Sequence, residues 1–245
     1  MAPKLSVNIN KYALLRNSRG RDAPNLLWAV DECVAAGAHG ITVHPRRDQR
    51  HIRTDDVPEV ARHLRARHPG CEYNVECEDA PELVELVLGV RPDQCTLVPV
   101  RPGELTSDHG FGREDVSGLL PTVERLKRAG IRVSLFVDCS PERVRALADS
   151  GADRVELYTG PYAWAWGGPA QETWRKAVWT SAEAAEQVGL GVNAGHDLDR
   201  HNLVGLRGLS ALREVSIGHA LVCRALEVGT RGSVRELLEA LTGSG

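Results

Sequence analysis

The sequence lacks the markers of several large protein classes. Its six cysteines are scattered, with no Cys-x-x-Cys pair and no His-x-x-x-His partner, so neither a zinc motif nor a dense disulfide framework is indicated. No apolar run is long enough to cross a bilayer, and the N-terminal MAPKLSVNINKYALL has neither the apolar segment nor the cleavage site of a signal peptide. These absences predict a cytoplasmic protein whose thiols are reduced and mostly buried.

An excess of charge of one sign is also missing. The 245 residues carry 30 Lys and Arg against 33 Asp and Glu, a formal net charge of -3 at pH 7. Such a balance gives no global field to hold a nucleic-acid backbone or an anionic membrane. We therefore expect small-molecule partners, with no nucleic acid and no membrane among them.

What the sequence does have is a regular alternation of two kinds of segment. Short β-branched or apolar runs, typical of buried strands, recur along the chain, and each is followed by an amphipathic stretch of helical length. The predicted strands span 5–10, 40–44, 72–76, 94–100, 132–138, 154–160, 190–195 and 214–219. Strict alternation of this kind predicts a parallel sheet.

Eight repeats without a break in composition favour closure of that sheet into a single-domain (β/α)8 TIM barrel over residues 1–241, with extra short helices or long loops. An open doubly wound sheet is the alternative, but no Gly-x-Gly-x-x-Gly follows the first strand and no second domain is visible. Residues 242–245 are polar and small, and we expect them to fray. The long connections 101–115 and 161–171 are suited to lids, and the second, with Trp164 and Trp166, is equally suited to a subunit contact.

Polar and titratable side chains follow most of the predicted strands. In a barrel of this type the carboxyl ends of the strands meet around one opening, where the chemistry usually lies. Taken singly, each side chain has a structural explanation, but two glutamates and several histidines on one rim favour an acid–base site. The residues are Asn8, Asn10, His44, Glu76, Glu156, Asn193, His196 and His219.

Candidate anion-binding groups accompany this rim. Gly195 and Gly218 follow the seventh and eighth predicted strands, where barrels commonly bind phosphate through backbone N–H groups at a helix N-terminus. Arg46 and His51, after the second strand, are candidates for holding a second anion. The other two arginines of this segment, Arg47 and Arg50, are expected to be ordinary surface charges.

Longer blocks of the sequence resemble one family, pyridoxine 5′-phosphate synthase, the last ring-forming enzyme of the deoxyxylulose-phosphate-dependent vitamin B6 route. The blocks run in the family's order over nearly the whole chain, so no single short motif carries the resemblance. They are VNINKYALLRNSRG (7–20), GITVHPRRDQRHI (40–52), NVE (74–76), TLVP (96–99), ELT (104–106), VSLFVD (133–138), VELYTGPYA (155–163), VNAGH (192–196) and IGHALVCRA (217–225).

The resemblance implies a barrel, usually assembled as a homo-octamer, that condenses 3-amino-2-oxopropyl phosphate with 1-deoxy-D-xylulose 5-phosphate. By this resemblance His44 and Glu76 are general bases, His196 is the general acid, and Glu156 stabilises charged intermediates. Proton transfers by such groups need no metal and no redox cofactor, so none is implied. The implied substrate contacts are Asn8, Arg19 or its neighbour Arg16, Gly218 and His219 for the aminoketone phosphate, and Arg46, His51 and Thr106 for the sugar phosphate.

Three positions depart from the family pattern, and all are expected to touch substrate. Asn10 and Lys11 stand where the family has an aspartate–histidine pair, and Asp197 replaces the glycine after NAGH. Both substrate pockets would be altered, because Asn10 is a neutral amide, Lys11 is a flexible ammonium and Asp197 places a carboxylate near phosphate. The function is therefore open between the ordinary synthase, a diverged enzyme that makes another heterocycle from other amine and carbonyl substrates, a sugar-phosphate isomerase or epimerase, and a silent binding or assembly protein.

Overall fold

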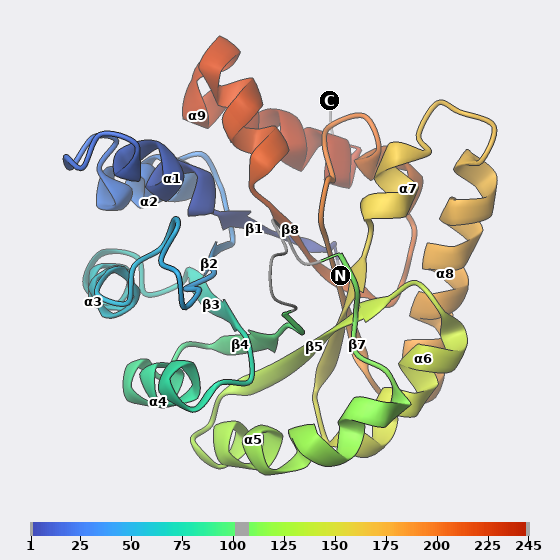
Figure 1. The fold of residues 1–245 in the computed structure, drawn as a ribbon. Helices are drawn as coiled ribbons and strands as arrows, with labels where there is room; N and C mark the ends of the chain where they lie inside the picture. The colour runs from blue at the N-terminus through green and yellow to red at the C-terminus, as the bar shows by residue number, and fades with distance from the viewer. Residues whose placement is uncertain (1, 101–107, 244–245) are drawn as a thin grey trace.

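The computed structural model describes residues 2–100 and 108–243 of the chain. Within them, parallel strands form a closed barrel in which each strand pairs with its sequence neighbours and the last pairs with the first (Figure 1). The strands are β1 (Lys4–Asn8), β2 (Gly40–Val43), β3 (Glu72–Cys77), β4 (Gln94–Leu97), β5 (Arg132–Asp138), β6 (Arg154–Tyr158), β7 (Gly191–Gly195) and β8 (Leu212–Ile217). The (β/α)8 barrel expected from the sequence is confirmed.

Helices surround the barrel on its outside (Figure 1). Local sequence signals fix where several begin: the side chain of Asn25 accepts the Trp28 N–H at the start of α2, and Ser140 followed by Pro141 opens α6. The helices are α1 (Asn10–Asn17), α2 (Leu26–Ala35), α3 (Asp56–Arg67), α4 (Pro81–Val90), α5 (Val116–Arg128), α6 (Pro141–Ala146), α7 (Gly160–Trp164), α8 (Gln171–Gln187) and α9 (His219–Thr242).

Several predicted strands differ in their bounds, since β4 ends at Leu97 rather than at 100 and β6 ends at Tyr158 rather than at 160. Two further differences have a local cause. The first strand stops at Asn8 and Asn10 begins α1, because the Asn8 side chain accepts the Asn10 backbone N–H at 3.0 Å and turns the chain. Residues 199–209, expected to be a helix, form only a 3-10 turn at Leu203–Leu206. The reason is local, since the Asp199 carboxylate accepts two nearby backbone N–H groups and competes with helix formation.

The long connections and the C-terminus also differ in part from expectation. Residues 101–107 lie outside the described residues, and the second connection begins with α7 rather than with loop. Trp164 is 68% exposed, but Trp166, also expected on the surface, is half-buried against the ring of Tyr162. α9 continues through Thr242, past the expected boundary at 241, and residues 244–245 lie outside the described residues.

Alternate residues of each strand point to opposite sides of the barrel wall. The outward set is apolar, for example Val7, Ile41 and Val155, and packs beneath the helices in the main core. The inward set is largely polar yet buried, and many of its members hydrogen-bond with one another. Ser6 and Thr42, for instance, share a hydrogen bond of 2.7 Å across the β1–β2 pair.

The amino-terminal half of the interior is closed by a polar layer, which we call the barrel floor: Gln94, Arg154, Asn193 and Glu214. Gln94 Oε1 accepts from Asn193 Nδ2 at 3.3 Å, Arg154 donates to Asn193 Oδ1 at 3.0 Å, and Arg154 lies 3.9 Å from Glu214. The expectation that Asn193 belongs to the functional rim is therefore wrong, because its side chain is used within the floor. Burial raises the pKa of Glu214 to about 7, although Arg154 opposes the shift.

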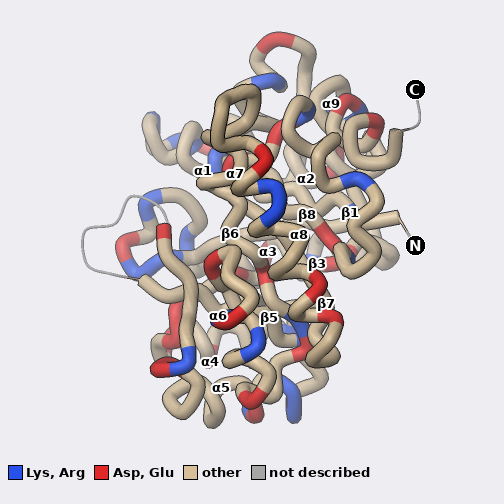
Figure 2. Tube along the Cα trace, turned by 90° about the vertical axis from the view of Figure 1, so that its right-hand side faces the viewer, with Lys and Arg blue, Asp and Glu red and all other residues tan. Residues whose placement is uncertain are grey.

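The outer surface carries charges of both signs. Figure 2 shows Lys and Arg interspersed with Asp and Glu along the trace rather than gathered at one end. No helix in the described part of the chain has the length and apolar character needed to span a membrane.

Candidate active site

A cavity of about 560 Å³ opens at the carboxyl ends of the strands. It is lined by residues of β1, β3, β6 and β8, of α1 and the start of α9, and of the segments after β2 and β7, as the rim pattern predicts. Asn193, Gly195, Arg16 and Arg19 are not among its lining residues. The other predicted site residues that the structure describes line it. They are Asn8, Asn10, Lys11, His44, Arg46, His51, Glu76, Glu156, His196, Asp197, Gly218 and His219.

His44 and Glu76 form a pair on one side of the cavity. They follow or end the adjacent strands β2 and β3, and His44 Nδ1 lies 3.4 Å from Glu76 Oε2. Asn8 Nδ2 donates to the same carboxylate oxygen at 3.5 Å. Both members of the pair are 8% exposed, so they are largely shielded from water while facing the cavity. This geometry suits two groups that pass protons to and from a bound molecule.

Glu156 lies deeper, near the end of β6. Burial, together with the negative charges of Glu76 and Glu214, raises its pKa well above the ordinary carboxyl value. Its Oε2 atom is buried with no hydrogen-bond partner. Gly195 on the paired strand β7 makes room for it, because a Cβ atom at position 195 would lie 2.4 Å from Glu156 Oε1. The raised pKa favours the protonated form of Glu156 at the cavity wall.

His196 completes the titratable set on the opposite side. Its φ of 78° is in the left-handed region, which non-glycine residues adopt only under constraint. Thr159 supplies the constraint, because its hydroxyl donates to the carbonyl oxygens of Gly195 and His196. The imidazole packs against Phe136 and Tyr158, each with a ring centroid 5.2 Å away. Burial in these surroundings lowers the His196 pKa, despite the opposing charges of nearby carboxylates.

One end of the cavity is strongly basic. Arg46 is only 7% exposed, yet its guanidinium forms no ion pair with any residue that the structure describes. Lys11 and His51 line the same end, and desolvation together with the charges of His44, Arg46 and Lys11 lowers the His51 pKa to about 3. A buried cation without a counter-ion is costly, so this end is suited to an anionic ligand.

A helix N-terminus forms a second anion-attracting end. α9 begins at His219 directly after Gly218, and its first backbone N–H groups face the cavity side of β8. Gly218 is required for close packing, since a Cβ atom there would lie 2.8 Å from the Asn8 carbonyl oxygen. The segment after the eighth strand, which the sequence suggests as a phosphate position, therefore lines the cavity.

Two predicted contacts do not reach the cavity. Arg19 is exposed in a turn after α1 and is not among the lining residues, and the alternative Arg16 is a buried structural residue. Both terminal nitrogens of Arg16 donate to the carboxylate of Asp56, at 2.6 and 2.8 Å, which ties α1 to α3. Thr106 lies outside the described residues.

A family model described as "Pyridoxal phosphate biosynthesis protein PdxJ" matches residues 5–243. The chain belongs to the PdxJ family. The pyridoxine 5′-phosphate synthase of Xanthomonas axonopodis pv. citri is 48% identical over 250 residues, which cover 98% of this chain and 97% of that protein. The pyridoxine 5′-phosphate synthase of Leptospira biflexa serovar Patoc is 45% identical over 254 residues, covering 98% and 97%. The family resemblance expected from the sequence is confirmed.

More distant structures share the barrel. Thiamine phosphate pyrophosphorylase from Pyrococcus furiosus has a TM-score of 0.63 at 16% identity, covering 97% of this PdxJ chain and 95% of that structure. Phosphoribosyl anthranilate isomerase from Thermus thermophilus has a TM-score of 0.59 at 15% identity, with coverage of 97% and 98%. At these identities the likeness shows the fold alone.

The first departure from the PdxJ pattern has a structural explanation. Asn10 Oδ1 accepts the backbone N–H of His44 at 2.9 Å, so the amide oxygen positions a residue of the proton-transfer pair. An aspartate oxygen would accept the same hydrogen bond, and the exchange to asparagine therefore changes the local charge rather than the local geometry. Lys11 adds a positive charge on the basic side of the cavity.

The second departure, Asp197, lines the cavity and has hydrogen-bond partners of its own. Its φ of 56° is a backbone conformation that glycine adopts most readily, which explains the family glycine on conformational grounds. The Asp197 carboxylate accepts the indole N–H of Trp164 at 2.8 Å, and its carbonyl accepts from Asn202 at 3.0 Å. Trp164 of α7 thus donates a hydrogen bond to a carboxylate whose charge would repel a nearby phosphate.

Sequence reasoning missed the apolar partners of His196 and the steric role of Gly195. Phe136 and Tyr158 stand in the predicted strands and look like ordinary core residues. The available signal was strand period, since Tyr158 is two residues from Glu156 on β6 and Phe136 is two residues from Ser134 on β5. Among described residues, the group with metal-ligand spacing lies outside this cavity, at Asp31, His63 and His68.

Proposed function

We propose that this chain condenses 3-amino-2-oxopropyl phosphate with 1-deoxy-D-xylulose 5-phosphate to give pyridoxine 5′-phosphate, inorganic phosphate and water. The proposal is carried by one observation: two candidate anion sites, one after β2 and one at the start of α9, open onto a single cavity that is also lined by His44, Glu76, Glu156 and His196. Two phosphorylated substrates need two anion sites, and a ring closure between them needs proton transfers in the space between.

We assign the substrates to the two ends by charge and shape. Arg46, Lys11 and His51 suit the phosphate of the sugar, because a buried guanidinium can hold phosphate oxygens in a bidentate fork. The start of α9 with Gly218 suits the phosphate of the aminoketone, because its backbone N–H groups and helix dipole favour an anion.

The titratable side chains of the cavity suit the proton transfers of imine formation, dehydration and aldol-like closure. The His44–Glu76 pair, 3.4 Å apart, takes protons from the amine and from carbon next to a carbonyl. His196, whose pKa is lowered by burial, readily returns a proton once it has received one, which suits loss of hydroxyl or phosphate. Burial raises the pKa of Glu156 and so favours its neutral form, and a cationic imine beside it would favour ionisation.

We further propose a homo-oligomer in a reducing, cytoplasmic compartment. Large apolar side chains are exposed on α1, α2 and α9, which contact one another, and Leu14 among them also lines the cavity. A second copy covering this face would therefore lie beside the active site. The scattered cysteine pattern supports the compartment.

The proposed function is tested by incubating the purified protein with both substrates. Phosphate release together with pyridoxine 5′-phosphate formation is expected, whereas interconversion of one sugar phosphate alone would support an isomerase. Glu76→Gln and His196→Asn should each lower kcat by roughly 10² or more. Glu78→Gln is the matched control, because Glu78 pairs with the exposed Arg47 instead. Folded variants with unchanged turnover would remove those residues from the mechanism.

A variant restoring the family residues tests whether the departures matter. Asn10→Asp, Lys11→His and Asp197→Gly are combined in one chain and assayed with the same substrate pair. Because Asn10 and Asp197 have local hydrogen-bond partners in the structure, we expect the unmodified chain to be active and the restored chain to improve it by less than about tenfold. An inactive parent rescued by the three substitutions would instead support altered substrates.

A further inference from the structure

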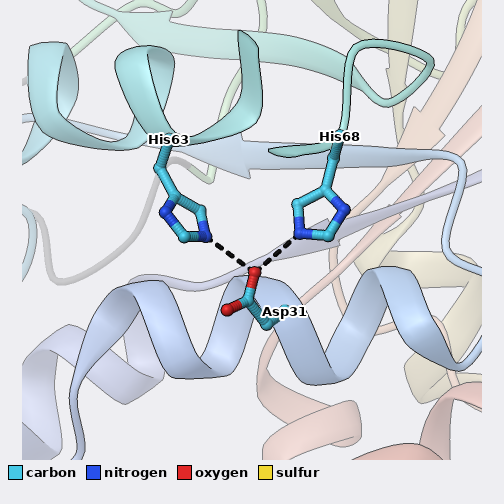
Figure 3. Close-up of side chains that lie close together, drawn as sticks. All are labelled: Asp31, His63 and His68. Atoms are coloured by element: carbon cyan, nitrogen blue, oxygen red, sulfur yellow. Dashed lines mark hydrogen bonds and ion pairs between the residues drawn. The ribbon is translucent and has the colours of Figure 1, made fainter. Parts of the chain in front are cut away.

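A second cluster of titratable side chains lies on the outer wall, between α2 and α3. Asp31 belongs to α2, His63 to α3, and His68 directly follows α3 (Figure 3). Both imidazoles point their Nε2 atoms at one carboxylate oxygen, Asp31 Oδ1, at 2.7 Å for His63 and 2.6 Å for His68. Throughout the described ranges, no other three histidine, cysteine or carboxylate side chains bring ligand atoms within 4.8 Å of one another.

We propose that Asp31, His63 and His68 bind a divalent transition-metal ion of the zinc type. Two imidazole nitrogens and one carboxylate oxygen, with the remaining position left to water, are a donor set that zinc takes in proteins. The charge is also suitable, because an ionised carboxylate with two neutral imidazoles partly neutralises the ion. Magnesium and calcium prefer oxygen donors and fit this set less well.

The rearrangement that the ion requires is small. With metal–ligand bonds of about 2.1 Å, donor atoms in a tetrahedral site lie about 3.4 Å apart. Here the two histidine nitrogens lie 2.7 and 2.6 Å from the carboxylate oxygen, so each must retreat by less than about 1 Å as the ion replaces the shared protons. Rotation of the imidazoles and of the carboxylate can supply this without moving either helix.

The partial exposure of the three side chains also favours binding of the ion. The Asp31, His63 and His68 side chains are 33%, 12% and 20% exposed, so the ion has an entry path while the imidazoles stay packed. The positive charge of Arg67 opposes binding of a metal cation, since Arg67 Nε is 4.0 Å from Asp31 Oδ1. Arg67 is 65% exposed at the end of α3, however, and its long side chain can turn into solvent.

The proposed ion would cross-link two helices whose ligands are 32 and 37 residues apart in sequence. The helices run back from the cavity end of the barrel, and His68 follows the end of α3, so the cluster lies toward the opposite end from the active site. We therefore expect the ion to stabilise the fold without changing the turnover of the enzyme.

The experiment titrates chelator-treated full-length protein with Co²⁺ and with Zn²⁺. One equivalent of Co²⁺ should give the intense visible absorption of a site of low coordination number, and Zn²⁺ should displace it and raise the Tm. His63→Gln/His68→Gln and, separately, Asp31→Asn should weaken binding by more than about 100-fold, beyond the loss that removal of an outer partner causes. His201→Gln, an exposed histidine outside the cluster, is the control and should bind normally.

A measurement on the unmodified chain guards against variants that fail to fold. In protein labelled with ¹⁵N at its 9 histidines, Zn²⁺ should shift the ring nitrogens of two of them and leave the cavity histidines in place. Absence of binding, binding that survives the double variant, or shifts confined to the cavity histidines would overturn the proposal. Turnover that is unaltered by zinc in the unmodified chain is expected.

Discussion

Gly195→Ala tests whether the missing side chain of Gly195 is needed to position the buried carboxyl group of Glu156. The backbone of Gly195 is not in the left-handed region, so alanine is conformationally acceptable in β7. The added Cβ would lie 2.4 Å from Glu156 Oε1, whereas ordinary contacts begin at 3.4 Å. The carboxyl group must therefore move by about 1 Å, or the strands must separate.

The two possible costs differ in size. Overpacking of a buried site typically costs about 1–3 kcal/mol, and the lower end applies because the clashing atom ends a rotatable side chain. A 1 Å displacement of a catalytic group, by contrast, can reduce turnover by about 10². We expect kcat for pyridoxine 5′-phosphate formation to fall by this factor while urea denaturation shows a loss of only about 1 kcal/mol.

A double-mutant cycle separates sterics from other effects. In a Glu156→Ala background the clash partner is absent, so adding Gly195→Ala should cost neither stability nor further turnover. A single Gly195→Ala variant that keeps turnover within about threefold of the parent would refute the view that this glycine holds Glu156 in its reacting position.

Three further predictions concern other parts of the chain. Arg46→Ala should raise KM for the sugar phosphate roughly 10- to 100-fold with a smaller change in kcat. The control Arg47→Ala removes a surface ion pair with Glu82 and should leave KM unchanged. Equal effects of the two substitutions on KM would contradict the basic anion site. Trp164→Phe removes the hydrogen bond to Asp197 and should raise KM about fivefold, measured against Trp174→Phe as the control. Glu214 has a folded-state pKa raised from 4.5 to about 7, so the native protein binds the extra proton and stability falls as pH rises between these values. Glu214→Gln should flatten that slope and be more stable than the parent at about pH 8 by on the order of 2 kcal/mol, as followed by denaturation at several pH values.

Much of this architecture could be predicted from the sequence because local and global signals agree. Strand β5 was predicted with its observed bounds, since alternate residues such as Val133 and Leu135 are apolar and the flanking turns are polar. His44, Glu76, Glu156 and His196 were located because chain topology alone brings the carboxyl ends of parallel strands together.

The rest depended on contacts between distant segments. Arg16 and Arg19 have similar local surroundings, and only the partner Asp56, 40 residues away, makes the first a structural residue. Likewise the turn at Asn10 depends on one side-chain hydrogen bond, which competes with a strand pattern that continues through the sequence. The identity of such partners is a property of the folded chain rather than of any window of residues.

The barrel floor has a consequence for how this enzyme could be redesigned. Glu214 belongs to that layer and touches none of the cavity, yet its negative charge is one of the causes, after burial and Glu76, that keep the pKa of Glu156 high. Both carboxyl groups are buried in the barrel, where charges are screened poorly. Substrate specificity can thus be altered at the rim loops, while the working pH of the same enzyme can be tuned independently from the far end of its barrel.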